Sequence, residues 1–138
     1  MANHSDTNGV QAITVVLARV CFASIFLLMG WRHFLSQTVA YAASQGVPMA
    51  SILVPFSGIL AVLGGLSILL GYRAKIGAWL IVLFLVGVTP KMHAFWAVGD
   101  PMMHQIQMIM FLKNVSMLGG ALLITQWGSG PLSLDGRV

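Results

Sequence analysis

The sequence from His104 to Trp127 is HQIQMIMFLKNVSMLGGALLITQW, an apolar stretch with a lysine and an asparagine at its centre. As a helix, this stretch is long enough to cross the ~30 Å hydrocarbon core of a bilayer. Inserting Lys113 beside Asn114 halfway along such a helix costs about 3 kcal/mol. We therefore expect another part of the protein, or a bound ligand, to compensate the lysine charge.

The composition of the whole chain is typical of an integral membrane protein, so its first partner is the lipid bilayer. Of its 138 residues, 58% are hydrophobic and only 7% are charged, whereas soluble domains have roughly 25% charged residues. The acidic residues Asp6, Asp100 and Asp135 all lie outside the apolar runs. The basic residues are dispersed singly, which argues against a polybasic surface and thus against a nucleic-acid partner.

Four apolar segments predict an all-α membrane protein, a four-transmembrane-helix bundle. We place these helices at about 10–31, 52–70, 74–96 and 104–127, within a transmembrane domain 10–127 flanked by a polar tail 1–9 and a C-terminal tail 128–138. An interfacial helix is expected before the break at Gly46-Val47-Pro48. Small residues spaced three or four apart in the second segment predict a face for close helix packing. They are Ser57, Gly58, Ala61, Gly64 and Gly65.

The distribution of basic residues predicts the orientation in the membrane. Four spans place both termini and the loop that carries Arg73 and Lys75 on one side, and Arg32 and Lys91 on the other. With Arg137 counted, the first side has the excess of basic residues, so the positive-inside rule predicts cytoplasmic termini. We expect a multi-pass protein of a cell inner membrane.

Arg19 and Lys113 are the two basic residues that lie deep within predicted spans. Arg19 is ~12 Å from the cytoplasmic end of the first span, and Lys113 is ~13 Å from the outer end of the last. If these spans are neighbours, the two cations share the middle of the bundle, where the chain has no carboxylate. Ionisable residues inside a membrane indicate a functional site, and here they indicate an anionic or electron-rich ligand.

The sequence also allows other ways of compensating the charges of Arg19 and Lys113. Lys113 could lose its proton on desolvation, or either cation could reach toward the interface. An anion could come from Asp135, if the tail folds back toward Arg19 as a structural ion pair, or from Asp100 in the outer loop. Backbone carbonyls and buried water could also satisfy a purely structural polar pair.

The last span also has a polar face that we expect to point inward. The residues at helical spacing on it are His104, Gln107, Phe111, Asn114 and Leu118. This face could donate hydrogen bonds to the carbonyl oxygens of a quinone, with Lys113 close enough to stabilise negative charge on its ring.

Metal and thiol chemistry have less support. His93 and His104 flank the outer loop near several methionines and could ligate haem or copper, but no repeated His/Met pattern occurs, so we predict no metal site. Cys21 is the only cysteine, which excludes disulfides within the chain and thiolate metal cages, and we expect it to be buried. The chain has no Ser/His/Asp triad, P-loop or dinucleotide-binding fingerprint, which argues against hydrolase and nucleotide chemistry.

The order of several short motifs resembles the DoxX family of small four-helix membrane proteins. These motifs are Arg19, Gly30-Trp31-Arg32-His33-Phe34, Gly46-Val47-Pro48, Gly64-Gly65-Leu66, Gly71-Tyr72-Arg73, Lys91-Met92-His93-Ala94-Phe95-Trp96, Phe111-Leu112-Lys113-Asn114, Leu118-Gly119-Gly120 and 128–135. The resemblance implies a four-helix bundle linked to membrane redox chemistry, since relatives include a subunit of an archaeal quinol oxidase, also described as thiosulfate:quinone oxidoreductase. It brings no agreed catalytic residues. The recurrent polar positions found here are Arg19, His93, Lys113, Asn114 and Asp135.

Three hypotheses of function follow. The leading one is a quinone-associated redox subunit that binds a quinone or a small anionic reductant, with Arg19, His93, Lys113 and Asn114 as candidate ligand-binding residues. Because the chain has no obvious electron carrier of its own, such a membrane oxidoreductase subunit would need a partner, for example another membrane redox subunit, or a bound cofactor. A homo-oligomer is also open. The second is a non-catalytic scaffold or assembly subunit of a larger complex. The third, a carrier for small anions, has less support because no inverted repeat is detectable.

Overall fold

The computed structural model describes residues 4–137, and side chains within residues 8–136. All regular structure in this part of the chain is helical: α1 (His4–Gly30), η1 (Trp31–Phe34), α2 (Ser36–Ser44), α3 (Ala50–Leu70), α4 (Ala74–Met92), η2 (Phe95–Ala97), α5 (Pro101–Trp127) and η3 (Asp135–Arg137). Four segments are long and apolar enough to cross a membrane: Asn8–Phe34, Ala50–Leu70, Ala74–Ala97 and Pro101–Trp127. The predicted four-helix membrane fold is confirmed.

Two helices begin earlier than the hydrophobic pattern indicates. α1 already begins at His4, inside the stretch expected to be a polar tail. α5 begins at Pro101 because Asp100 caps it: the Asp100 carboxylate accepts a hydrogen bond from the Met103 N–H at 2.8 Å. Proline is favoured at the first position of a helix, where its missing N–H removes no hydrogen bond. Local capping chemistry thus adds polar turns to an apolar span.

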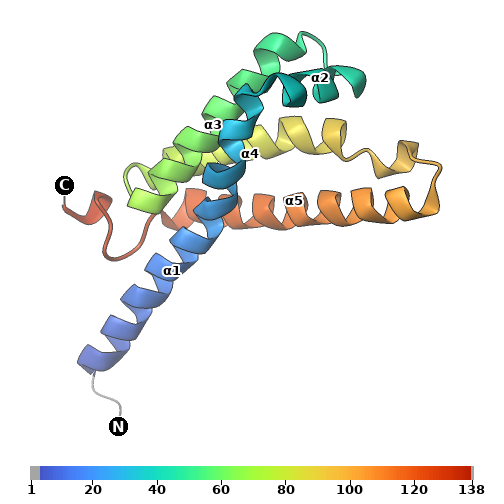
Figure 1. The fold of residues 1–138 in the computed structure, drawn as a ribbon. Helices are drawn as coiled ribbons and strands as arrows, with labels where there is room; N and C mark the ends of the chain where they lie inside the picture. The colour runs from blue at the N-terminus through green and yellow to red at the C-terminus, as the bar shows by residue number, and fades with distance from the viewer. Residues whose placement is uncertain (1–3, 138) are drawn as a thin grey trace.

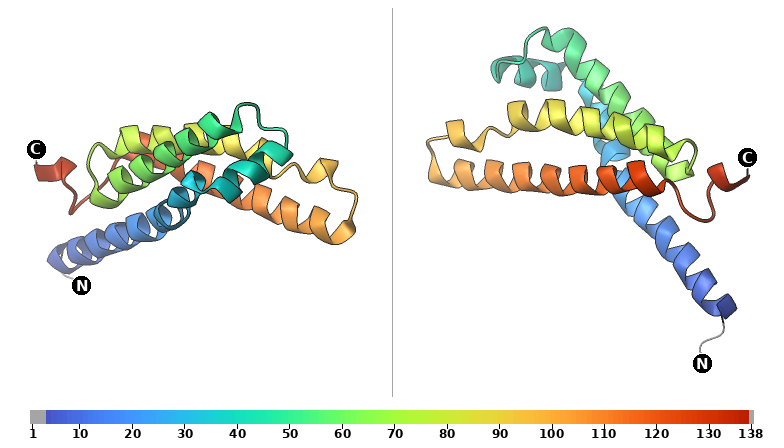
Figure 2. Two further views of the ribbon diagram at one scale, coloured as in Figure 1. Left: turned by 45° about the horizontal axis from the view of Figure 1, so that its top comes forward. Right: turned by 180° about the vertical axis from the view of Figure 1, so that it is seen from behind.

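The long helices pack in sequence order. α1 packs against α3, α3 against α4, and α4 against α5 (Figures 1 and 2). α1 runs alongside α3 and crosses α4 and α5 steeply, and its N-terminal half projects beyond the other helices (Figure 1). The main core lies where α1, α3, α4 and α5 meet, around Phe26, Ile68, Ile81, Leu85 and Ala121. α1 and α5 are therefore edge helices, each with one long-helix neighbour along most of its length.

The small residues of α3 allow the close helix packing that the sequence predicts. A Cβ at Gly64 would lie 2.8 Å from both the carbonyl oxygen of Gly77 and the side chain of Ile81, both on α4. On the α1 side, a Cβ at Gly65 would lie 3.1 Å from Leu27. Such contacts hold membrane helices together where no hydrophobic driving force acts between them.

The outer surfaces of the helices are apolar, as expected for contact with lipid. Large apolar side chains are exposed on every span, including Leu17, Ile59, Leu83 and Leu123. Cys21 belongs to this surface: it is exposed, which corrects the expectation that it is buried. The reason is that α1 packs on one side only, so its other residues face outward.

Candidate functional site

Arg19 on α1 is the charged residue whose environment is most unusual. Among the basic residues whose side chains the structure describes, it alone is buried, with 7% of its surface exposed. Its Nη2 atom donates a hydrogen bond to the carbonyl oxygen of Leu132 at 2.7 Å. Its Nε and Nη1 atoms are also buried, and no described residue accepts a hydrogen bond from them. Unsatisfied donors on a buried cation are costly, so a hydrogen-bond acceptor beside Arg19 would stabilise the folded protein.

Arg19 is one of the residues that line an almost entirely apolar cavity of about 280 Å³. Phe22 and other residues of α1 line one wall, and Gly120, Leu123 and Ile124 of α5 line the opposite wall. Arg19 and Ser129 are the residues in the lining with polar side chains. Leu123 is also 57% exposed on the outside of α5, so the cavity reaches the outer surface of the bundle. A cation at one end of an apolar space suits an amphiphile with an electron-rich head group.

The cavity exists because α1 and α5 diverge. They approach each other where the ring of Phe22 lies against Gly120, so closely that a Cβ at Gly120 would be 2.9 Å from the ring. Toward the N-terminus of α1, the two helices separate, since α1 follows α3 and α5 follows α4 (Figure 2). The space between them is the cavity that Arg19 lines.

The C-terminal tail folds back and closes this end of the bundle. The Leu134 and Asp135 N–H groups donate hydrogen bonds to the carbonyl oxygens of Leu70 and Gly71, at 3.3 and 2.8 Å. Gly71 adopts a left-handed conformation with φ of 63°, and a Cβ there would collide with Arg19 and with Ser133. Glycine is therefore required at the point where the tail, the α3–α4 loop and the guanidinium group meet.

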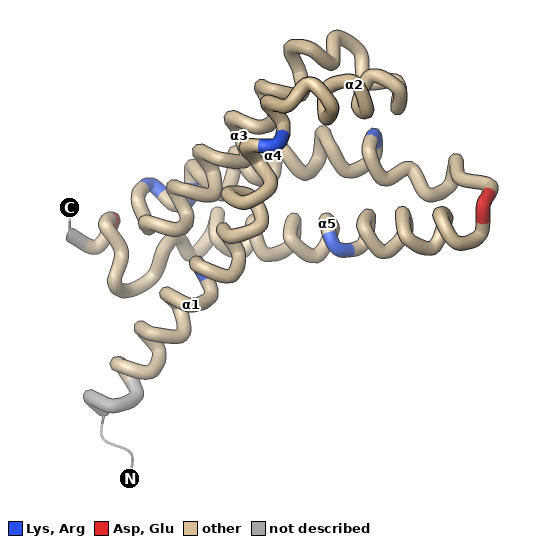
Figure 3. Tube along the Cα trace, in the orientation of Figure 1, with Lys and Arg blue, Asp and Glu red and all other residues tan. Residues whose placement is uncertain are grey.

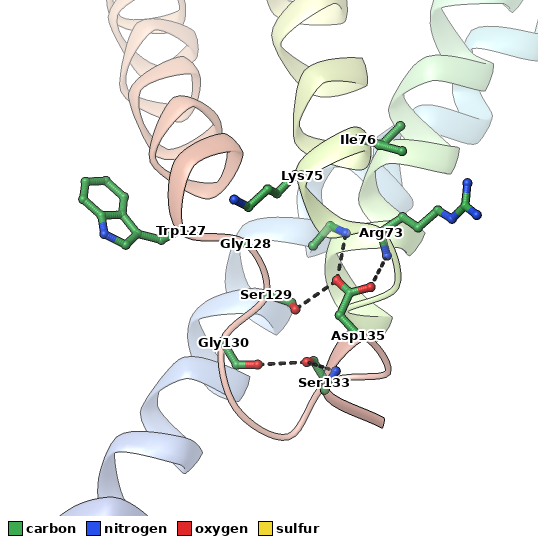
Figure 4. A pocket seen from close by; sticks show the side chains of 11 residues that line it. Arg73, Lys75, Ile76, Trp127, Gly128, Ser129, Gly130, Ser133 and Asp135 are labelled. Atoms are coloured by element: carbon green, nitrogen blue, oxygen red, sulfur yellow. Dashed lines mark hydrogen bonds between the residues drawn. The ribbon is translucent and has the colours of Figure 1, made fainter. Parts of the chain in front are cut away.

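Asp135 fastens the tail to the start of α4. Its carboxylate accepts hydrogen bonds from the N–H groups of Arg73 (2.6 Å) and Ala74 (3.2 Å) and from the Ser129 hydroxyl (3.1 Å) (Figure 4). Desolvation opposes ionisation of Asp135, but these hydrogen bonds outweigh it, and with the field of Arg19 they lower the pKa of the carboxyl. An open depression of about 550 Å³, lined by Lys75 and Trp127, lies beside it (Figure 4).

The expected direct ion pair between Asp135 and Arg19 is thus not formed within the described residues. The carboxylate caps a helix N-terminus, where anions are favoured, and it acts on the arginine only through space. The backbone of Leu132 meets the guanidinium group instead. The tail therefore supplies a carbonyl oxygen, rather than a charge, to Arg19.

His93 and Asn114 lie at the interface between α4 and α5, away from the cavity beside Arg19. His93 Nδ1 is 2.8 Å from Oε1 of Gln107. The buried Asn114 donates a hydrogen bond from Nδ2 to the hydroxyl of Thr89 at 3.1 Å. The inward polar face predicted for the last span is therefore confirmed. Each pair joins the two helices, so these polar groups satisfy one another.

Lys113 contacts neither Arg19 nor the polar residues between α4 and α5. It is exposed on α5, and its Nζ lies 3.4 Å from the sulfur of Met110 on the same helix. Lys113 and Arg19 would share the middle of the bundle only if α1 and α5 were neighbours, and this condition is not met, because α1 packs along α3. Figure 3 shows the charged positions scattered singly, with the acidic ones at the ends of helices.

Comparison with known proteins identifies the family of this chain. The family model of DoxX matches residues 14–94, which run from α1 to the end of α4. The chain belongs to the DoxX family. Among its relatives, Inner membrane protein YphA of Escherichia coli is 30% identical over 139 residues, covering 96% of this chain and 95% of that protein. Inner membrane protein YqjF of the same species is 28% identical over 127 residues, covering 91% and 92%.

A eukaryotic relative matches over a shorter stretch. An ER-derived vesicles protein of Saccharomyces cerevisiae is 28% identical over 80 residues, which cover 58% of this chain and 26% of that protein. No solved structure matches the chain. The bacterial relatives and the four apolar helices together identify this DoxX-family chain as a multi-pass inner membrane protein.

Some contacts of this DoxX protein escaped prediction from the sequence. Ser129 and the Leu132 carbonyl contribute to the site, and the only available signal was the order Gly128-Ser129-Gly130-Pro131, whose turn residues favour a defined loop. The hydrogen bond between His33 Nδ1 and the Ser57 hydroxyl, at 2.8 Å, was also missed. In the described part of the chain, no three His, Cys, Asp or Glu side chains are grouped as a metal site requires.

Proposed function

We propose that this protein is a quinone-associated subunit of a membrane redox system, and that the quinone head group binds beside Arg19 between α1 and α5. The observation that supports this most is a buried arginine, with two nitrogen atoms that have no described partner, among the residues that line an apolar cavity. A quinone carbonyl oxygen accepts hydrogen bonds and suits those two donors. The apolar walls suit its ring, and the opening beside Leu123 suits a prenyl chain that continues into lipid.

The charge of Arg19 gives the site a chemical preference. A fixed cation beside an electron-rich oxygen stabilises negative charge that develops there, most strongly in a poorly hydrated cavity. A small anionic reductant would be attracted by the same group. Because the chain has a single cysteine and no grouping of three His, Cys, Asp or Glu side chains in its described part, the electrons in this proposal are exchanged with a partner subunit or a bound cofactor.

The remaining candidate residues have other roles in this proposal. His93 and Asn114 hold α4 and α5 together through Gln107 and Thr89, so they fix the wall of the cavity without touching the head group. Asp135 keeps the tail docked, which places the Leu132 carbonyl on Arg19. In this proposal, Arg19 is thus the one candidate residue that contacts the head group directly.

Bound ligand in protein purified in mild detergent tests the proposal. Solvent extraction and mass spectrometry should recover about one quinone per chain from the unmodified protein. We expect Arg19→Leu to lose at least nine tenths of this quinone, because the two donors and the charge disappear together. Lys91→Leu, which removes an exposed cation at the end of α4, is the matched control and should retain it.

The outcomes differ clearly. Equal quinone content in Arg19→Leu and the unmodified protein would contradict the proposed site. A fatty acid or another lipid anion in place of quinone would contradict the redox function. Thermal unfolding of both variants shows whether a loss of ligand reflects a loss of fold.

We also propose that both termini face the cytoplasm. The supporting observation is the excess of basic residues at that end of the bundle. Arg73, Lys75 and Arg137 lie on the side of the termini, and only Arg32 and Lys91 lie on the other side. In a Cys21→Ser background, a cysteine at Gly136 should react with a membrane-impermeant maleimide only after cells are opened. Labelling of intact cells would show that the termini face away from the cytoplasm.

A further inference from the structure

A lysine near the middle of α5 points away from the bundle. Lys113 lies ~18 Å along the helix axis from Pro101, its side chain is exposed, and its one polar contact is the weakly accepting sulfur of Met110. A cation that faces hydrocarbon at such a depth is energetically costly. The cost disappears if a protein surface that offers an acceptor covers this position.

The surface around Lys113 is suited to contact with another helix. α5 packs against α4 and η2, and its opposite side remains exposed. Ser116 and Gly119 follow Lys113 at three-residue spacing, so the three positions are neighbours on the helix surface. A Cβ at Gly119 would have no atom within 4 Å. Small residues of this kind allow the backbone of a second helix to approach closely.

The charge of Lys113 determines which occupant fits. A second copy of this chain in the same orientation would bring another lysine to the same height in the membrane. Among the side chains that the structure describes, it would bring no carboxylate to that height, because Asp100 caps the start of α5 and Asp135 lies in the tail. The occupant that complements this surface therefore comes from a different protein.

We propose that the face of α5 around Lys113, Ser116 and Gly119 binds a transmembrane helix of another protein, and that this helix carries an aspartate or glutamate at the height of Lys113. The carboxylate pairs with the ammonium group of Lys113. The small residues Ser116 and Gly119, which follow Lys113 along α5, allow the two helices to pack closely. This inference is independent of the quinone site, since Lys113 is not among the residues that line the cavity beside Arg19.

Photo-crosslinking in native membranes tests this interface. A benzophenone amino acid replaces Ile109, an exposed residue one turn from Lys113, and Leu83, exposed on α4, serves as the control site. We expect an adduct from position 109 with one protein whose membrane span contains an Asp or Glu, and no such adduct from position 83. Lys113→Leu should reduce the adduct at least tenfold, whereas Lys113→Arg should retain it.

Charge exchange completes the test. Lys113→Asp should abolish the adduct, and replacement of the partner's acidic residue by lysine should restore it. Adducts with lipid alone would overturn the proposal and indicate that Lys113 reaches the interface unaided. Adducts with a second copy, or with a protein whose yield does not change in Lys113→Leu, would overturn it too. Because the exposed Lys113 supports no other side chain, we expect Lys113→Leu to unfold at or above the temperature of the unmodified protein.

Discussion

At the scale of single residues, Arg19 has one hydrogen bond and two donor nitrogen atoms without a described partner. If its role were to hold the tail, its removal would cost about 1.5 to 3 kcal/mol, the usual value for a hydrogen bond to a charged group. In ligand-free protein we expect Arg19→Met to change the free energy of unfolding by less than about 1 kcal/mol, because relief from a buried charge offsets the lost bond. Thermal unfolding after detergent exchange measures this. A destabilisation of several kcal/mol would assign Arg19 a structural role.

Gly64 and Gly119 differ only in what surrounds them, which makes them a matched pair. A Cβ at Gly64 would lie 2.8 Å from the Gly77 carbonyl oxygen and from Ile81, whereas a Cβ at Gly119 meets nothing. We therefore expect Gly64→Ala to destabilise the bundle by about 1 to 3 kcal/mol, the usual cost of overpacking. Gly119→Ala should be neutral or slightly stabilising, as alanine is in a helix. Equal unfolding temperatures would show that α3 and α4 are not in close contact at Gly64.

At the scale of the helices, α4 and α5 are joined by the hydrogen bond between Thr89 and Asn114. Such bonds in membrane proteins contribute about 0.6 kcal/mol on average and up to about 1.7. A double-mutant cycle with Thr89→Val and Asn114→Leu should give a coupling energy in this range, with the quinone content unchanged. If Asn114→Leu instead lost quinone while its stability was unchanged, Asn114 would be a ligand-binding residue.

The tail is held by a carboxylate whose effect depends on pH. The pKa of Asp135 in the folded protein lies below its ordinary value of 3.8. The cap therefore stabilises the docked tail fully above about pH 5, and this stabilisation is lost as the pH falls through the folded-state pKa. In a Cys21→Ser background, the anisotropy of a dye on a cysteine at Gly136 should drop on acidification. Asp135→Asn should show a smaller change with pH, and equal titrations would exclude Asp135 as the titrating group.

At the scale of the whole molecule, hydrophobic patterning predicted the four spans and the close packing of α3 around Gly64. It also predicted the inward face of α5 that carries Asn114. Depth along a helix axis, however, says nothing about which side of the bundle a residue occupies, so Lys113 and Arg19 were placed together although α1 and α5 diverge. The tail returns through bonds between residues far apart in sequence, such as Asp135 and Arg73. No local pattern indicates such pairings.

The tail connects three helices, so its removal should affect the whole bundle. Leu132 bonds to Arg19 on α1, Leu134 bonds to Leu70 at the end of α3, and Asp135 caps α4. Deletion of residues 131–138 removes all of these contacts and leaves the Arg19 guanidinium group without a described partner. We expect the deletion to lower the free energy of unfolding by about 2 to 4 kcal/mol, counted as a few hydrogen bonds of about 1 kcal/mol each. Thermal unfolding of the deletion variant and of Asp135→Asn, measured side by side, distinguishes the contribution of the helix cap from that of the rest of the tail. If the deletion leaves both the unfolding temperature and the bound quinone unchanged, the docked tail supports neither the bundle nor the site beside Arg19.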